Sequence, residues 1–205
     1  MKIKTALLVL LGFVIGILAG LSEVQAEASF EYCKDMALID NADRIQTLER
    51  DEKVDLILVS KVRHRLYLLS AGKVLKEFKV SFGFGLQQGP KLKEGDGRTP
   101  EGNYVVELKN PQSNYHLALK VSYPNAQDRS RAKKLKVNPG SDIMIHGLPT
   151  KFIDSLVPEV IQRIHTLRDW TQGCIAVTDS EIEQIYSLVE EQTQIQICPL
   201  STTRP

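Results

Sequence analysis

Short runs of apolar residues, separated by turn residues, dominate the first half of the chain beyond its N-terminal region. The runs at 54–59, 65–69 and 74–82 follow one another closely, and a Ser-Ala-Gly-Lys turn at 70–73 joins the last two. Apolar runs of this length, bounded by turn residues, are typical of β-strands. We therefore expect a folded domain that begins with antiparallel hairpins.

A stretch rich in glycine and proline, residues 83–102, interrupts this pattern. The strand pattern then returns at 103–108, 116–122 and 142–145, and residues 194–198 indicate a last edge strand. Many short strands at such spacing are typical of a β-sandwich or an open barrel. The predicted fold class is mainly β with peripheral α-helices.

Helical patterns mark the periphery of this domain. The expected helices are residues 40–50, a segment after Asn125, residues 158–168 and a segment after Thr178. The third has Pro158 in its first turn and one apolar stripe, formed by Val160, Ile161, Ile164 and Leu167. In the fourth, Thr178 and Glu181 form a capping-box pattern, so Cys174 is expected in a loop just upstream of a helix start.

The N-terminus has the pattern of a secretory signal peptide. Positive residues at 1–4 precede an apolar run at 6–21, and Val24-Gln25-Ala26 offers a small-x-small cleavage site. We expect a signal peptide over residues 1–26 and export to the periplasm or cell envelope. An uncleaved membrane anchor is the alternative, although the run is short for a spanning helix.

Composition describes an ordinary globular chain. With 205 residues, 42% hydrophobic residues and a formal net charge of +1, we expect one domain with a sizeable core and no nucleic-acid partner. Basic residues cluster at 91–98 and 129–136. The clusters face either an anionic partner or only solvent.

The chain has three cysteines, at 33, 174 and 198. Export places them in an oxidising compartment. An odd number of cysteines there indicates either an intermolecular bridge or a free thiol. Cys33 and Cys198 can join the two ends of the domain and leave Cys174 unpaired, although the sequence leaves the other pairings open.

Cys174 is the candidate nucleophile. A free thiol has a pKa of about 8.5, so a cysteine nucleophile needs an imidazole or a positive field, and His146 offers the imidazole. Gly173 leaves room for a substrate backbone, and nearby amides can face a developing oxyanion. The alternative is a small core cysteine beside a glycine.

Four motifs carry a family resemblance. They are EGDGRTPEG at 94–102, SYPN at 122–125, IMIHG at 143–147 and DWTQGCIAV at 169–177. Together they resemble the L,D-transpeptidase catalytic domain (YkuD) family of bacterial cell-wall enzymes, and its YafK-like branch, over residues 54–199. The predicted organisation is therefore a signal peptide at 1–26, a helical segment at 27–53, this catalytic domain and a tail at 200–205.

The resemblance implies a β-sandwich-like domain in which a cysteine attacks the third residue of a peptidoglycan stem peptide, expels D-alanine and forms a thioester. Cys174 then matches the nucleophile and His146 the base, with Gly147 beside it. The amides of Gly173 and Cys174 match the oxyanion donors. No cofactor or metal is implied, and a zinc site of Cys174, His146 and His165 is disfavoured because closed sites normally have four ligands.

Five further residues are candidates for substrate binding. They are Arg98, His116, Tyr123, Thr171 and Gln172. Arg98 either clamps a substrate carboxylate or belongs to a structural turn. His116 either lines the cleft or faces solvent, and Tyr123 packs against either substrate or core.

This chain departs from the family pattern at three places. Gln172 and Ala176 stand where many members carry histidine and arginine. The interval between His146 and Cys174 is also longer than usual, and it contains His165, for which we expect a surface or interface position on a lid or specificity element. Trp170, next to the cysteine motif, is expected in the core.

The predicted function is that of an exported cysteine acyltransferase acting on peptidoglycan stem peptides. A diaminopimelate amine, a lysine of a wall-attached lipoprotein or water can resolve the thioester. One alternative is an L,D-hydrolase or carboxypeptidase that releases lipoprotein or D-alanine, and another is a non-catalytic wall-binding module. The sequence does not indicate the oligomeric state.

Overall fold

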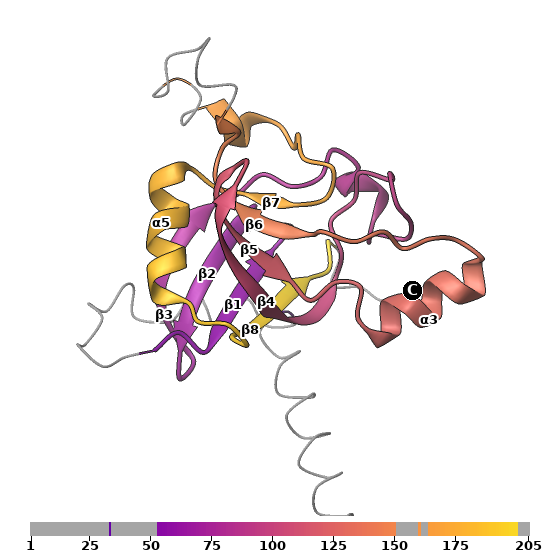
Figure 1. Ribbon diagram of the computed structural model, residues 1–205, viewed down its shortest axis with the longest axis horizontal. Coiled ribbons are helices and arrows are strands. Elements are labelled where there is room, and N and C mark those ends of the chain that lie inside the picture. The colour runs from indigo at the N-terminus through magenta and orange to yellow at the C-terminus, as the bar shows by residue number, and fades with distance from the viewer. Residues whose placement is uncertain (1–32, 34–52, 151–159, 161–163, 201–205) are drawn as a thin grey trace, which may run out of the picture.

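The computed structural model of the chain describes residue 33, residues 53–150, residue 160 and residues 164–200 (Figure 1). In this part of the chain eight strands form a sheet in the order β3-β2-β1-β8-β4-β5-β6-β7. The strands are β1 (Leu56–Ser60), β2 (Arg65–Ser70), β3 (Lys73–Lys79), β4 (Gly102–Ser113), β5 (His116–Val121), β6 (Met144–His146), β7 (Ile175–Ala176) and β8 (Gln194–Cys198). The predicted fold class, mainly β with peripheral helices, is confirmed.

β1, β2 and β3 form the antiparallel start that their apolar runs predict. The predicted position of β8 is wrong, because this strand lies inside the sheet. It runs parallel to β1, with Ile197 beside Val59, and antiparallel to β4, with Ile195 beside Tyr104. Ile195 and Ile197 are buried, as a central position requires.

β4 joins two layers of the sheet. Residues 102–105 of β4 pair with β8, whereas residues 106–113 pair with β5. The hydrophobic core contains residues from both layers, among them Leu66 and Leu68 on β2 and Leu119 on β5. Ser81, just beyond β3, exchanges two backbone hydrogen bonds of 2.9 Å with Ala176 of β7 and so joins the two ends of the sheet.

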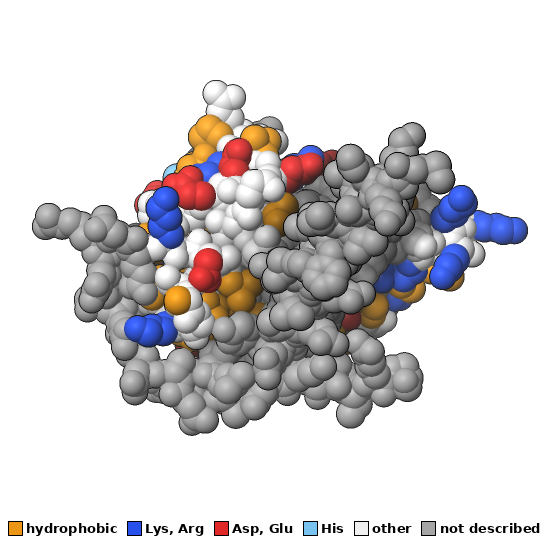
Figure 2. All heavy atoms as spheres, turned by 90° about the horizontal axis from the view of Figure 1, so that it is seen from below, with side chains coloured by type: hydrophobic (Ala, Val, Ile, Leu, Met, Phe, Trp, Pro, Cys, Tyr) orange, Lys and Arg blue, Asp and Glu red, His pale blue; other side chains and the backbone are white. Residues whose placement is uncertain are grey.

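Two α-helices flank the sheet in the described part of the chain. α5 (Asp179–Leu188) begins at the predicted capping box of Thr178 and Glu181, and its Ile182 and Ile185 are fully buried against the sheet. α3 (Ala126–Leu135) projects from the other side of the domain, and Figure 2 shows Lys and Arg side chains gathered at that end. Two short 3-10 helices, η1 (Leu86–Gln88) and η3 (His165–Leu167), lie in loops.

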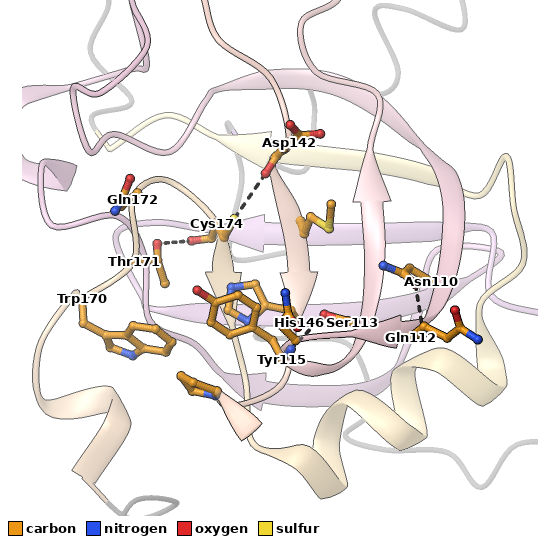
Figure 3. A pocket seen from close by; sticks show the side chains of 13 residues that line it. Asn110, Gln112, Ser113, Tyr115, Asp142, His146, Trp170, Thr171, Gln172 and Cys174 are labelled. Carbon is orange, nitrogen blue, oxygen red and sulfur yellow. Dashed lines mark hydrogen bonds between the residues drawn. The ribbon is translucent and has the colours of Figure 1, made fainter. Parts of the chain in front are cut away.

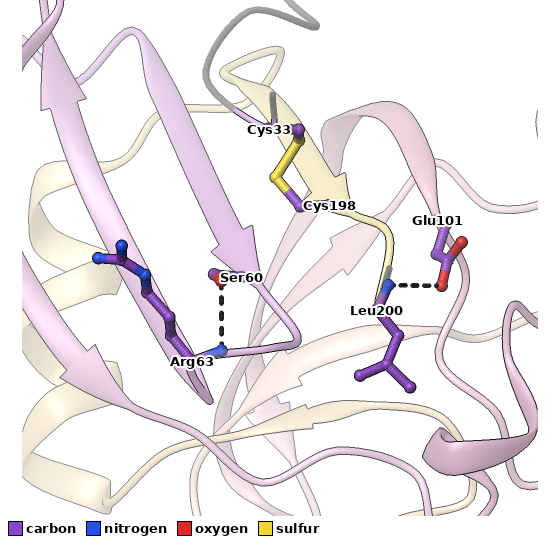
Figure 4. The surroundings of a disulfide bond; sticks show 6 residues. All are labelled: Cys33, Ser60, Arg63, Glu101, Cys198 and Leu200. Atoms are coloured by element: carbon purple, nitrogen blue, oxygen red, sulfur yellow. Dashed lines mark hydrogen bonds between the residues drawn. A yellow bond between two sulfur atoms is a disulfide. The ribbon is translucent and has the colours of Figure 1, made fainter. Parts of the chain in front are cut away.

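A disulfide joins Cys33 to Cys198 at the end of β8, with an S–S distance of 2.02 Å (Figure 4). The predicted signal peptide and the helix at 40–50 lie outside the described residues, as do residues 201–205 of the predicted tail at 200–205. Of the helix expected at 158–168, residues 158, 159 and 161–163 also lie outside them. Within the described residues, no helix is long and apolar enough to span a membrane.

Candidate active site

A pocket of about 800 Å³ opens beside Cys174 (Figure 3). Three parts of the chain supply most of its walls. They are the β4–β5 hairpin (Asn110 and residues 112–115), β6 with its approach (Asp142, Met144 and His146) and the cysteine loop (residues 170–172 and Cys174), with Pro149 in addition. The structure thus brings four predicted site residues together: His146, Thr171, Gln172 and Cys174.

The parallel pairing of β6 and β7 determines how His146 and Cys174 lie. Ile145 is the partner of Ile175, so Cys174 falls opposite Met144 by extension of the register. Met144 and His146 are two residues apart on one strand and therefore point to the same face. The thiol and the imidazole consequently open on the same pocket, although 27 residues lie between them in the sequence.

His146 is held in one tautomer. Its Nδ1 lies 2.6 Å from the carbonyl oxygen of Gly147, which can only accept, so Nδ1 carries the proton and Nε2 is free to act as a base. Gly147 is required here, because a Cβ at this position would lie 2.6 Å from the Asp179 carboxylate. The Tyr115 ring packs on His146 at 4.3 Å and the Trp170 ring approaches edge-on at 6.0 Å. Burial lowers the pKa of His146 to about 4.

The thiol of Cys174 is unpaired and partly exposed, and its Sγ lies 3.5 Å from the carbonyl oxygen of Asp142. Burial raises the pKa of Cys174 above its ordinary value, and the charge of Asp142 adds to this. The backbone amide of Met144 and the charge of Lys91 act in the opposite direction. Burial thus favours the neutral thiol and the neutral imidazole when no substrate is present.

Thr171 organises the cysteine loop. Its hydroxyl donates to the carbonyl oxygen of Cys174 at 2.7 Å and accepts from the amide of Gly173 at 3.1 Å. The prediction that the Gly173 amide faces an oxyanion is corrected, because this amide already has an acceptor. The amide of Cys174 has no acceptor among the described residues and remains the candidate donor.

Gly173 fits its position for two other reasons. Its φ of +129° lies in a region that residues with a Cβ rarely adopt. A Cβ there would also lie 2.6 Å from the carbonyl oxygen of Arg98. The Gly-Arg-Thr-Pro-Glu-Gly segment at 97–102 thus packs directly beneath the cysteine loop.

The cysteine loop is tied to the chain that follows β3. Phe82 and Thr171 are joined by a backbone hydrogen bond of 3.1 Å, and the amide of Phe84 donates to the Thr171 carbonyl at 3.0 Å. The Asp169 carboxylate accepts from the amide of Phe82 at 2.8 Å and lies 3.1 Å from Nε2 of His64. His64 is therefore a partner of this loop.

A buried ion pair supports the 97–102 segment from below. Nζ of Lys61 is fully buried and donates to the Thr99 carbonyl at 2.6 Å and to Oε1 of Glu101 at 2.9 Å. The Thr99 hydroxyl in turn accepts from the amide of Gly83 at 3.1 Å. Oε1 of Glu101 also accepts from the amide of Leu200, beyond the disulfide (Figure 4).

Three predicted substrate-binding residues lie outside the pocket walls. The Arg98 guanidinium donates to Gln88 at 3.1 Å and to the Pro90 carbonyl at 3.4 Å, as the structural-turn alternative implies. Tyr123 is buried, and its hydroxyl donates to the Pro139 carbonyl at 2.9 Å. His116 lies beyond the pocket and contacts Glu183 of α5 at 2.7 Å.

Tyr115, Asp142 and Trp170 all line the pocket, although the sequence did not indicate the first two and Trp170 was expected in the core. No local pattern identifies them, because each reaches the pocket through contacts between distant strands and loops. His165 is also corrected: its side chain is buried, while Leu167 of the expected apolar stripe is 75% exposed. Among the described residues no group of three His, Cys, Asp or Glu side chains is arranged to hold a metal ion.

Comparison with known proteins agrees with this geometry. A profile of the L,D-transpeptidase catalytic domain family, YkuD, matches residues 54–197. YafK of Escherichia coli K12, a candidate L,D-transpeptidase, is 27% identical over 168 residues, which are 78% of this chain and 54% of YafK. The chain therefore spans about half the length of this curated relative.

A solved structure is similar as well. The helical cell shape determining protein Pgp2 of Campylobacter jejuni superposes with a TM-score of 0.52 and 27% identity, over 80% of this chain and 54% of Pgp2. YafK and Pgp2 together support the predicted YafK-like branch.

Proposed function

We propose that this chain, which belongs to the L,D-transpeptidase catalytic domain family, is an exported cysteine acyltransferase that acts on peptidoglycan stem peptides. One observation carries the proposal: the single unpaired cysteine of the described chain, Cys174, shares an open pocket with a histidine whose Nε2 is free. The likeness to Pgp2 supports a role in wall remodelling and cell shape.

The first half-reaction starts from the neutral pair. As Sγ of Cys174 attacks the carbonyl carbon of the third stem residue, Nε2 of His146 takes the thiol proton, so no charged group has to exist beforehand. Negative charge develops on the carbonyl oxygen, and the free amide of Cys174 is the donor that can stabilise it. The imidazolium then protonates the departing amine, the C–N bond breaks, and D-alanine leaves.

The second half-reaction resolves the thioester. An amine or a water molecule attacks the acyl carbon while neutral His146 accepts its proton, and the thiolate leaves and is reprotonated. A diaminopimelate amine gives a cross-link, a lysine amine attaches a lipoprotein, and water gives hydrolysis. Acyl transfer to an amine is the function that we propose, and hydrolysis is an outcome that the assay distinguishes.

The burial of His146 supports its role as the base. A histidine with a pKa of about 4 remains neutral at the pH of the envelope, so it is able to accept a proton at every turnover. His146 becomes basic enough to accept the thiol proton during the attack itself, because the imidazolium forms beside the negative charge on the substrate. The Gly147 carbonyl then stabilises the imidazolium through Nδ1.

The test is incubation of purified protein with defined muropeptides, followed by mass analysis of both the products and the intact protein. We expect release of D-alanine, a thioester adduct on Cys174 and cross-linked products. Cys174→Ser is the matched control, because it keeps the size of the side chain but replaces the thiol with a poorer nucleophile. Equal turnover by wild type and Cys174→Ser would contradict the proposal, and binding without any adduct would support the wall-binding module.

A further inference from the structure

The pocket beside Cys174 carries one negative charge. Asp142 is the only carboxylate among the described residues that line it, and no lysine or arginine is among them. His146, the other titratable group beside the thiol, is neutral because burial lowers its pKa to about 4. A ligand therefore meets a cavity of neutral walls with a single anionic group.

Asp142 stands next to the reacting atom. Its carbonyl oxygen is the group that lies 3.5 Å from Sγ of Cys174, and Figure 3 shows its carboxylate beyond that carbonyl, on the side away from the thiol. The side chain is exposed, and Ser141 donates its hydroxyl to Oδ2 at 2.8 Å. Oδ1 has no hydrogen-bond partner among the described residues and is available to a ligand.

The cations near Asp142 are bound to other carboxylates. Nζ of Lys120 pairs with Glu107 at 3.0 Å, and this ion pair, more than Asp142, raises the pKa of Lys120. Lys91 is buried and pairs with Asp96 at 3.1 Å. Neither lysine makes a salt bridge with Asp142, so its charge is left for a ligand.

Among the described residues that line the pocket, no side chain offers a cation to a substrate carboxylate. Gln172 is neutral, Ala176 is buried and apolar, and the Arg98 guanidinium is bound to Gln88 and Pro90. The electrostatics thus favour a substrate that brings an ammonium group close to Asp142.

We propose that Asp142 is a specificity residue that binds the side-chain ammonium of a basic third residue in the stem peptide. The inference rests on the proposed function and deepens it, because it names the group that the pocket recognises. An ammonium held by Oδ1 at the rim brings the carbonyl of the same residue toward Sγ of Cys174. Substrates whose amine is acylated lose this contact.

The test compares two tetrapeptide donors that end in D-alanine and differ only at the third residue, which is lysine in one and Nε-acetyl-lysine in the other. The rate of acylation of Cys174 is followed by intact-protein mass spectrometry. Wild type should prefer the free amine by roughly 1.4- to 5-fold, the range for an exposed charge pair. The preference should fall as salt is added.

Asp142→Asn should bring the ratio of the two rates close to 1, and Asp142→Glu should keep part of the preference. The ratio is the useful measure, because removing the charge of Asp142 also changes the pKa of Cys174 and so alters both rates alike. Glu190→Gln, which removes an exposed carboxylate outside the pocket, is the charge-matched control and should leave the ratio unchanged.

The outcomes separate the two proposals. An unchanged ratio in Asp142→Asn, or equal rates for both donors in wild type, would overturn the role of Asp142 while acylation itself still supports the proposed function. If neither donor nor any muropeptide acylates Cys174, the proposed function is overturned, and the role of Asp142 with it.

Discussion

The buried pair of Lys61 and Glu101 should contribute strongly to stability. Lys61→Met removes the ammonium that pairs with the mostly buried Glu101 carboxylate at 2.9 Å and deprives the Thr99 carbonyl of its donor at 2.6 Å. Nζ of Lys61 is fully buried, so water cannot replace it in the native structure. Breaking a buried ion pair by removing one partner costs about 3–5 kcal/mol. We expect a loss of that size in the free energy of unfolding.

Urea denaturation followed by tryptophan fluorescence measures this loss, provided that the slope with denaturant is unchanged. The double variant Lys61→Met/Glu101→Gln is the control, because it removes both charges, and it should recover part of the lost stability. Arg65→Met, which breaks an exposed ion pair with Glu77, should cost no more than about 1 kcal/mol. A loss below about 1 kcal/mol in Lys61→Met would refute the reasoning, as would a double variant less stable than the single one.

Four further predictions concern the site and the ends of the domain. His146→Ala should reduce acylation by roughly 10²- to 10⁴-fold, whereas His165→Ala should leave acylation per folded molecule nearly unchanged; equal losses would contradict the assignment of the base. The pH dependence of Cys174 alkylation by iodoacetamide should give an apparent pKa above the ordinary thiol value. An apparent pKa below 7 would contradict the neutral pair. Because the pKa of His146 is lowered to about 4 from 6.5, its contribution to stability should be complete above pH 6.5 and lost as the pH falls toward 4, which urea titrations across this range measure. Replacing Cys33 and Cys198 with serine should cost roughly 2–5 kcal/mol, and peptide mapping without reductant should recover this bridge and no other.

The sequence predicted those features that depend on neighbouring residues. Each strand run from 54 to 146 lies on an observed strand, and the capping box of Thr178 and Glu181 begins α5, because side-chain alternation and helix caps are local properties. The position of β8 was missed, since nothing in its own residues shows that β1 is its parallel neighbour. The pairing of Ala176 with Ser81 was missed for the same reason.

The candidate site shows the same division. His146 and Cys174 are chemically distinctive residues in motifs, so the sequence alone identifies them. Tyr115 and Asp142 are ordinary residues that acquire a role only through the hairpin and the β6 approach. The Gly173 amide was assigned to an oxyanion because the sequence does not reveal that the Thr171 hydroxyl is its acceptor.

The central position of β8 has a consequence for the order in which the domain can assemble. During synthesis, β1 emerges more than 130 residues before β8, its parallel neighbour. Until residues 194–198 arrive, β1 and β4 each expose an unpaired edge and cannot join into one sheet. Contacts this distant in the sequence slow folding, and the unpaired edges favour aggregation until β8 is available.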